Sequence, residues 1–161
     1  MPPNRLPAAI GLISDTHGLL RPEAQSALEG SELIVHAGDV GTPEILEQLQ
    51  RIAPVVAVRG NIDRGSWASA LPRSAVAQTA GGSIYVLHDL HQLDLDPAVA
   101  GFTIVVSGHS HKPDKHERAG ALYLNPGSAG PRRFRLPITI ARLDVSRRPF
   151  HIEFVDLAPA V

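Results

Sequence analysis

Short apolar runs alternate with amphipathic segments along the N-terminal part of the chain. The runs at Ala8–Ser14, Glu32–Ala37 and Pro54–Val58 have the length and the aliphatic content of buried strands. Between them, Arg21–Glu29 and Glu44–Arg51 have the pattern of short helices. This alternation predicts βαβ units, and therefore a parallel sheet.

The second half of the chain is richer in strand patterns. Ser74–Thr79 and Ser83–His88 flank a glycine-containing turn, which predicts a β-hairpin. Phe102–Ser107 reads as another buried strand. These segments, with the later strand patterns, predict a second and more antiparallel sheet. The later strands are expected at Ala121–Leu124, Ile138–Asp144 and His151–Asp156, and loops at 64–73, 89–100 and 112–119.

Length and composition favour a single α/β domain over residues 1–161. A chain of 161 residues is long enough for one sizeable core, and its 43% hydrophobic and 4% aromatic content makes that core aliphatic. The net charge of −1 offers no basic field for long nucleic acid. With no cysteine, disulfides, thiolate zinc sites and a cysteine nucleophile are excluded.

The sequence has no pattern typical of a secretory signal or a membrane helix. The N-terminal segment has too short an apolar run for a signal peptide. Later runs do not approach the ~18–20 apolar residues of a membrane helix. We therefore expect a cytoplasmic protein without a membrane partner.

Polar side chains with metal-binding chemistry follow the predicted strands. Because parallel strands end at one edge of a sheet, these groups are expected to lie together. Each motif alone is weak, since Asp-x-His and Gly-Asp are also common as turns and helix caps. The seven candidates, drawn partly from eight histidines, are Asp15, His17, Asp39, Asn61, His88, His109 and His111.

The donor set indicates a pair of transition-metal ions. Imidazole nitrogens with carboxylate and amide oxygens suit Mn²⁺, Ni²⁺, Zn²⁺, Fe or Co²⁺, whereas four histidines are unsuited to Ca²⁺. Seven ligands are too many for one zinc ion but fit two ions that share a carboxylate. Two carboxylates against two divalent ions leave a positive centre that suits a phosphate ester.

The ordered motifs D-T-H, G-D, G-N, H and G-H-S-H resemble the calcineurin-like metallophosphoesterase superfamily. More narrowly, they resemble its small bacterial and archaeal phosphodiesterase branch, which is related to the retromer scaffold subunit. The resemblance runs from Ile10 to about Arg142 and includes the Asn-Pro-Gly-Ser turn at 125–128. It implies a four-layer α/β/β/α sandwich with two mixed β-sheets.

The resemblance also implies a role for each candidate. The nucleophile would be a metal-bridging hydroxide, with Mn²⁺ as the expected metal and Asp39, Asn61 and His109 as the catalytic residues. The first ion would be bound by Asp15, His17 and His111, the second by Asn61, His88 and His109, and Asp39 would bridge the two.

Two positions depart from the family pattern. Ile62 stands where larger relatives carry a histidine that protonates the leaving group or holds the phosphate. Asp89 follows His88 where glycine is common, and is expected to narrow the site or to support a ligand. Protonation of the leaving group would then come from water or another residue.

Other polar residues have simpler interpretations. We expect His36 to be a partly buried structural residue and Asp63 to brace the Asn61 loop. His91 is the alternative to His88 as ligand, while His116 and His151 are expected at the surface. Arginines that could steady a phosphate, or simply belong to solvated loops, are Arg59, Arg64, Arg132, Arg133 and Arg135.

The sequence therefore predicts a divalent-metal-dependent phosphoesterase, more specifically a phosphodiesterase, that acts on a small phosphoester. A non-catalytic protein-interaction scaffold on the same fold is the main alternative. The second alternative is a nuclease that acts on short nucleotide diesters. The sequence leaves the oligomeric state open, including a homo-oligomer.

Overall fold

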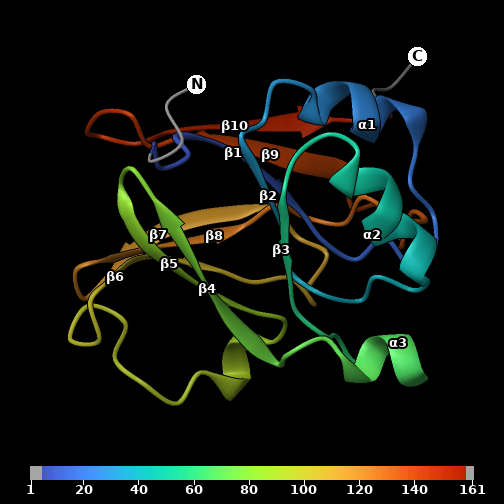
Figure 1. The fold of residues 1–161 in the computed structure, drawn as a ribbon, viewed down its shortest axis with the longest axis horizontal. Coiled ribbons are helices and arrows are strands. Elements are labelled where there is room, and N and C mark those ends of the chain that lie inside the picture. Colours follow the sequence, from blue (N-terminus) through green and yellow to red (C-terminus); the bar gives the residue numbers. More distant parts are fainter. Residues whose placement is uncertain (1–4, 159–161) are drawn as a thin grey trace.

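The computed structural model describes residues 5–158 and contains two five-stranded sheets packed face to face (Figure 1). The first sheet has the strand order β10-β9-β1-β2-β3. Its strands are β1 (Ala9–Ile13), β2 (Leu33–His36), β3 (Val55–Ala57), β9 (Thr139–Asp144) and β10 (His151–Asp156).

The second sheet has the strand order β4-β5-β6-β8-β7. The β4–β5 and β7–β8 pairs are antiparallel, whereas β5–β6 and β6–β8 are parallel. Its strands are β4 (Ser74–Thr79), β5 (Gly82–Leu87), β6 (Phe102–Val106), β7 (Asp114–Arg118) and β8 (Ala121–Asn125).

Aliphatic side chains fill the space between the layers. Leu12, Val35 and Ile104 belong to the core between the two sheets. Ile13 and Ile34 point to the other face of the first sheet, where they pack with α1 and α2. Within residues 5–158, four short helices complete the fold: α1 (Pro22–Leu28), α2 (Pro43–Gln50), α3 (Ser66–Ser69) and the 3₁₀ turn η1 (Leu90–Gln92).

The layering agrees with the predicted four-layer sandwich, although the layer outside the second sheet is thin. The outer face of this sheet presents Val105 and Tyr123, against which Leu90 and Leu93 of the η1 region pack. A short turn and a loop, in place of long helices, bury the apolar side chains of this outer face. Part of the outer face of the second sheet is therefore not covered by helices.

The parallel arrangement of β1, β2 and β3 confirms the predicted βαβ units. The prediction that all the later strands form a second, more antiparallel sheet is wrong, because β9 and β10 return to the first sheet. Each sheet has two parallel and two antiparallel pairings. Strand β9 buries both faces, with Leu143 in the core between the sheets and Ile140 on the helix side.

The three segments predicted as loops contain regular structure. Helix α3 lies within 64–73, η1 within 89–100 and β7 within 112–119. Strand β7 has the sequence DKHER with every residue exposed, so it carries no alternation of apolar and polar residues. Within residues 5–158, no helix has the length and apolar character needed to cross a membrane.

Candidate metal centre

The candidate ligands lie just beyond the carboxyl ends of strands from both sheets. Asp15 and His17 follow β1, and Asp39 follows β2 in the first sheet. His88 follows β5, and His111 lies on the segment after β6 in the second sheet. Strands that run in the same direction end at the same edge, which brings these five side chains together.

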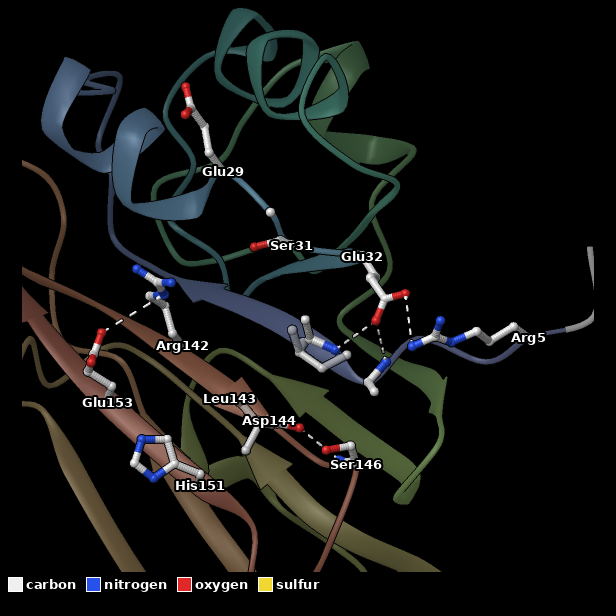
Figure 2. A pocket seen from close by; sticks show the side chains of 14 residues that line it. Arg5, Glu29, Ser31, Glu32, Arg142, Leu143, Asp144, Ser146, His151 and Glu153 are labelled. Carbon is white, nitrogen blue, oxygen red and sulfur yellow. Dashed lines mark hydrogen bonds and ion pairs between the residues drawn. The ribbon is translucent and has the colours of Figure 1, made fainter. Parts of the chain in front are cut away.

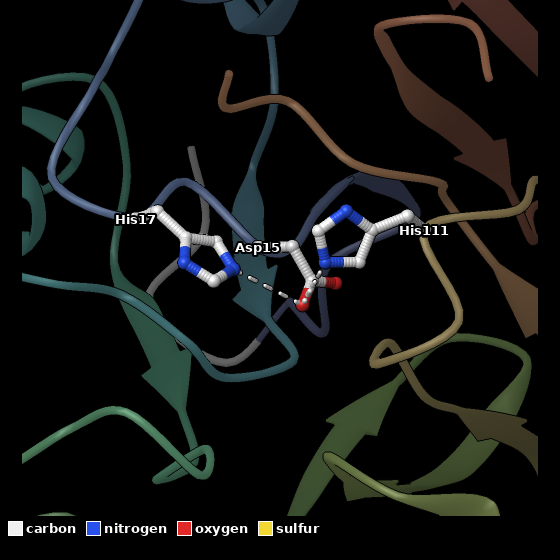
Figure 3. A group of neighbouring side chains, drawn as sticks. All are labelled: Asp15, His17 and His111. Carbon is white, nitrogen blue, oxygen red and sulfur yellow. Dashed lines mark ion pairs between the residues drawn. The ribbon is translucent and has the colours of Figure 1, made fainter. Parts of the chain in front are cut away.

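One group of three comprises Asp15, His17 and His111 (Figure 3). The Nε2 atoms of His17 and His111 lie 3.9 and 3.4 Å from Oδ1 of Asp15. One nitrogen or oxygen of each residue lies within 4.8 Å of those of the other two. Two imidazoles and a carboxylate that converge in this way form a suitable set of ligands for one divalent ion.

A second group comprises Asp15, Asp39 and His88. Oδ2 of Asp39 lies 3.3 Å from Nε2 of His88 and 3.4 Å from Nε2 of His17. Oδ1 of Asp15 lies 3.9 Å from Nε2 of His88. The two groups therefore share one carboxylate, Asp15, and Asp39 lies between a histidine of each.

Several buried polar atoms at this centre have no hydrogen-bond partner within residues 5–158. They include Oδ1 of Asp15 and the Nε2 atoms of His17 and His88. Buried polar atoms are nearly always paired, so three unpaired atoms within two adjoining groups of side chains require an explanation. A bound cation supplies it, because each atom has a lone pair available for coordination. The residues present therefore fit divalent metal ions.

Hydrogen bonds behind the ligands fix their orientation. Nδ1–H of His88 donates to the carbonyl of Ala37 over 2.7 Å, which leaves Nε2 as the coordinating atom. Oδ2 of Asp15 accepts hydrogen bonds from the Ser14 hydroxyl at 2.7 Å and the His109 backbone N–H at 3.1 Å. These bonds direct Oδ1 of Asp15 toward the histidines.

The ligands perturb each other's pKa values. Burial acts to raise the pKa of Asp39, but contact with His88 and the Ile62 backbone N–H lowers it to about 2. Burial acts to lower the pKa of His88, but its close contact with Asp39 and the charges of both carboxylates raise it. Asp39 is therefore ionised at neutral pH, as a metal ligand must be.

Five candidate ligands adopt left-handed backbone conformations. Their φ angles lie between 49° and 72°. Residues other than glycine rarely have positive φ, and such strain is concentrated at functional sites, where the surrounding structure maintains it. The five are Asp15, His17, Asp39, His109 and His111.

Two glycines allow the backbone to approach the carboxylates closely. A Cβ atom at Gly60 would overlap the backbone nitrogen and Oδ1 of Asp39. A Cβ atom at Gly108 would overlap the hydroxyl of Ser14 and lie 2.7 Å from Oδ2 of Asp15. The glycines of the G-N and G-H-S-H motifs are therefore required by space at the ligands.

The other two candidates, Asn61 and His109, lie at the exposed rim. The imidazole of His109 meets that of His88 edge to face, with centroids 5.2 Å apart. Nε2 of His109 lies 4.0 Å from Oδ2 of Asp89, so Asp89 contacts a candidate ligand from outside the buried cluster. Asn61 adjoins Ile62, whose backbone N–H donates to Oδ1 of Asp39 over 3.1 Å.

The candidate phosphate-binding arginines lie in surface segments. Arg59 is half-buried, and its backbone N–H donates to the carbonyl of Pro72. Arg64 is exposed. Within residues 5–158, neither guanidinium forms an ion pair. A phosphate-binding role for either residue remains a prediction.

Several interpretations of neighbouring residues are confirmed. Asp63 accepts hydrogen bonds from the backbone N–H groups of Val40, Gly41 and Gly60, so it braces the loops around the centre. His36 is structural and even more buried than expected, with 0% exposure. It accepts a hydrogen bond from the Gly38 N–H at Nδ1, which leaves Nε2–H facing the hydroxyl of Thr16.

The remaining histidines lie outside the buried cluster. The side chain of His91 is 95% exposed and pairs with Asp89, which favours His88 as the ligand. His116 and His151 are exposed, as predicted.

Sequence reasoning missed the residues that hold the ligands in place. The Ser14 hydroxyl supports Asp15, and the Ser128 hydroxyl donates to the carbonyl of Asp15 over 3.1 Å. The side-chain amide of Asn125 donates to the carbonyl of Gly108 over 3.0 Å. The Asn-Pro-Gly-Ser turn is visible as a motif, but its bonds connect distant segments and leave no periodic signal.

A separate cavity lies near the amino ends of β1 and β2, away from the metal centre (Figure 2). Its volume is about 420 Å³. Glu32 accepts hydrogen bonds there from the N–H groups of Ala8 and Ala9, and Arg142 pairs with Glu153 at 3.9 Å. Glu32 thus connects the loop before β2 to the start of β1, whereas the Arg142–Glu153 pair is exposed and contributes little to stability.

Comparisons with known proteins agree with this geometry. A protein of Methanothermobacter thermautotrophicus that carries the name Probable metallophosphoesterase is 37% identical over 148 residues, covering 84% of this chain and 86% of the relative. The solved structure of an archaeal phosphodiesterase has a TM-score of 0.76 at 22% identity, covering 91% of this chain and 99% of the other. Vacuolar protein sorting 29 from Cryptosporidium parvum has a TM-score of 0.71 at 20% identity, covering 94% and 98%.

The family model for the calcineurin-like phosphoesterase superfamily domain matches residues 9–148. This span includes all seven candidate ligands and both sheets apart from strand β10. The chain therefore belongs to the calcineurin-like phosphoesterase superfamily.

Proposed function

We propose that this protein is a phosphodiesterase with a dinuclear metal centre. The observation that carries the proposal is that two adjoining groups of ligand-type side chains contain buried atoms without a partner within residues 5–158, from Asp15, His17 and His88. The proposed first site has Asp15, His17 and His111 as ligands, with Asp39 shared between the two sites. Asn61, His88 and His109 complete the second site.

When bound, two divalent ions supply a hydroxide nucleophile at neutral pH and neutralise charge on the transferring phosphoryl group. The chain itself provides the fixed geometry. Asp39 is held as a carboxylate by the Ile62 N–H and its histidine neighbours. Asn61 and His109 are exposed at the rim, which is compatible with a proposed contact with the phosphate.

The way in which the leaving group obtains a proton limits which substrates can react. Ile62 is 42% exposed at the rim and has no proton to donate. The departing oxygen must therefore take its proton from water or another residue, or leave as a stable anion. This favours small diesters with good leaving groups, and the phosphodiesterase among the fold neighbours supports the same class.

The test is hydrolysis of bis(p-nitrophenyl) phosphate by protein loaded separately with Mn²⁺, Ni²⁺, Zn²⁺, Fe²⁺ or Co²⁺. The expected result is turnover that requires metal, with Mn²⁺ among the supporting ions and two ions bound per chain by elemental analysis. The matched control is His91→Ala, which removes an exposed histidine beside the centre. No turnover by protein with two ions bound would overturn the proposal and favour the scaffold alternative.

A further inference from the structure

A groove of about 460 Å³ lies beside the candidate metal centre, on the outer face of the second sheet. This volume lies in the usual range for small-molecule sites. We call it the β7 groove; its lining includes His109, Ser110, Lys112, His116, Arg118 and Tyr123. His109 lines the groove and its imidazole also meets that of His88, so the groove borders the proposed second metal site.

Strand register explains how β7 forms one wall of the groove. His116 is opposite Tyr123, and Arg118 is opposite Ala121. Side chains that face each other across a strand pair lie on the same face of the sheet. Tyr123 and Ala121 both belong to the cluster on the outer face. His116 and Arg118 therefore project on this face, where the helical cover is thin.

An aromatic platform lies in the groove. The imidazole of His116 is stacked on the ring of Tyr123, with centroids 5.1 Å apart and planes 10° from parallel. A 2.6 Å hydrogen bond between Nδ1 of His116 and Asp114 holds the imidazole in this plane. The His116 side chain is 44% exposed, so its outer face is available to a further flat ring.

The groove offers hydrogen-bond donors to a polar ligand. Its carboxylates are paired with histidines: Asp89 with His91 at 3.1 Å and Asp114 with His116 at 2.6 Å. Lys112 and Arg118 form no ion pair within residues 5–158. The Ser110 hydroxyl accepts from the Lys112 N–H and from Asn125, so its own hydrogen remains for a ligand.

We propose that the β7 groove binds the nucleoside arm of a phosphodiester substrate, with the base stacked on His116. The proposal rests on the proposed function, which places the phosphorus at the metal centre. A flat heterocycle explains the rigid imidazole platform, and Ser110, Lys112 and Arg118 can donate hydrogen bonds to the base and sugar, which a hydrocarbon ring could not accept. Base stacking on an aromatic side chain tolerates different bases, so the expected selectivity is for nucleosides as a class.

The test compares two diesters that differ in one arm, thymidine 5′-(p-nitrophenyl) phosphate and methyl p-nitrophenyl phosphate. Each hydrolysis adds one water, breaks the bond between phosphorus and the nitrophenyl oxygen, and releases nitrophenolate, a phosphate monoester and one proton to solvent. For the thymidine diester, His116→Ala should raise KM about tenfold, at the usual strength of base stacking, with little change in kcat. Kinetics with the methyl diester should not change.

Two further variants separate stacking from general disturbance of the strand. His116→Phe keeps an aromatic ring and should restore most of the lost affinity, seen as a KM near that of the wild type. Lys115→Ala alters the neighbouring exposed residue, which is paired opposite Leu124 on the other face of β7, and should match the wild type. Equal KM values of wild type and His116→Ala for the thymidine diester would overturn the groove proposal while leaving the proposed function intact.

A binding measurement makes the test independent of catalysis. Thymidine 5′-monophosphate is titrated into chelator-treated protein and followed by NMR chemical shifts. The expected result is shifts at residues of the β7 groove, weakened about tenfold by His116→Ala. If neither diester is hydrolysed, groove-centred shifts would still support the groove proposal, and their absence would overturn it.

Discussion

Oδ2 of Asp39 lies 3.3 Å from Nε2 of His88, although the two residues follow strands of different sheets. Asp39 extends from the end of β2 and His88 from the end of β5. The contact therefore exists only when the two sheets are packed in the correct relative position. Formation of the centre is coupled to packing of the core between the sheets.

Asp39→Asn is predicted to cost more activity than any other single ligand change. The side chain keeps its size but loses the charge that the proposed bridging role requires. The loss should exceed the roughly 10- to 100-fold effect of changing a residue that only supports a ligand. The measurement is metal-dependent diester hydrolysis together with metal content. If Asp39→Asn kept near wild-type turnover while His91→Ala abolished activity, the assignment of Asp39 as the bridging ligand and of His88 in place of His91 would be wrong.

Ser14→Ala tests the support of Asp15. Loss of the 2.7 Å hydrogen bond frees the carboxylate to rotate, and metal affinity should fall by roughly 10- to 100-fold. Competition with a chromophoric chelator gives the affinity. The matched control is Ser83→Ala, because the Ser83 hydroxyl also donates to a side chain but lies on the surface of β5. Equal affinities of the two variants would exclude a supporting role for Ser14.

Gly60→Ala separates crowding at the ligands from the general cost of replacing glycine. The new methyl group overlaps Asp39, so we expect a loss of about 1–3 kcal/mol in unfolding free energy together with weaker metal binding. Gly30 has φ +88°, and a methyl group there would meet no atom within 4 Å. Gly30→Ala should therefore cost about 1–2 kcal/mol and leave metal binding unchanged. The idea fails if both variants bind metal equally well.

His36 should make the metal-free protein less stable in mild acid. Burial lowers its pKa from 6.5 to about 4, although nearby carboxylates act to raise it. Unfolding therefore takes up a proton between these two pH values, and stability falls as pH falls through this window. At the standard conversion of pKa difference to free energy, the full contribution is about 3 kcal/mol.

The measurement is urea unfolding of chelator-treated protein at several pH values, for wild type and His36→Gln. The variant should be less stable at neutral pH but should lose less stability on acidification. His88 has a raised pKa and contributes in the opposite direction in both proteins, so it cancels in the comparison. Parallel pH profiles would show that His36 is not the group responsible.

The fold was largely predictable where the hydrophobic pattern was strong. Strands β1, β2 and β3 and helices α1 and α2 are present as expected, because local periodicity and turn residues specify them. Strand β7 was not predictable, because DKHER lies on an exposed edge and no core selects its residues. The pairing of β9 with β1 could not be predicted either, because it depends on contacts between residues far apart in the sequence.

The sequence by itself determined the types of the candidate ligands, their order at strand ends and the family to which the chain belongs. Tertiary structure decided which of these groups are buried together, with Asp15, His17, Asp39, His88 and His111 clustered and Asn61 and His109 at the rim. It also created the β7 groove from residues with no sequence motif. The physical reason is that ligand identity is local to each turn, whereas distances between turns depend on how the two sheets pack.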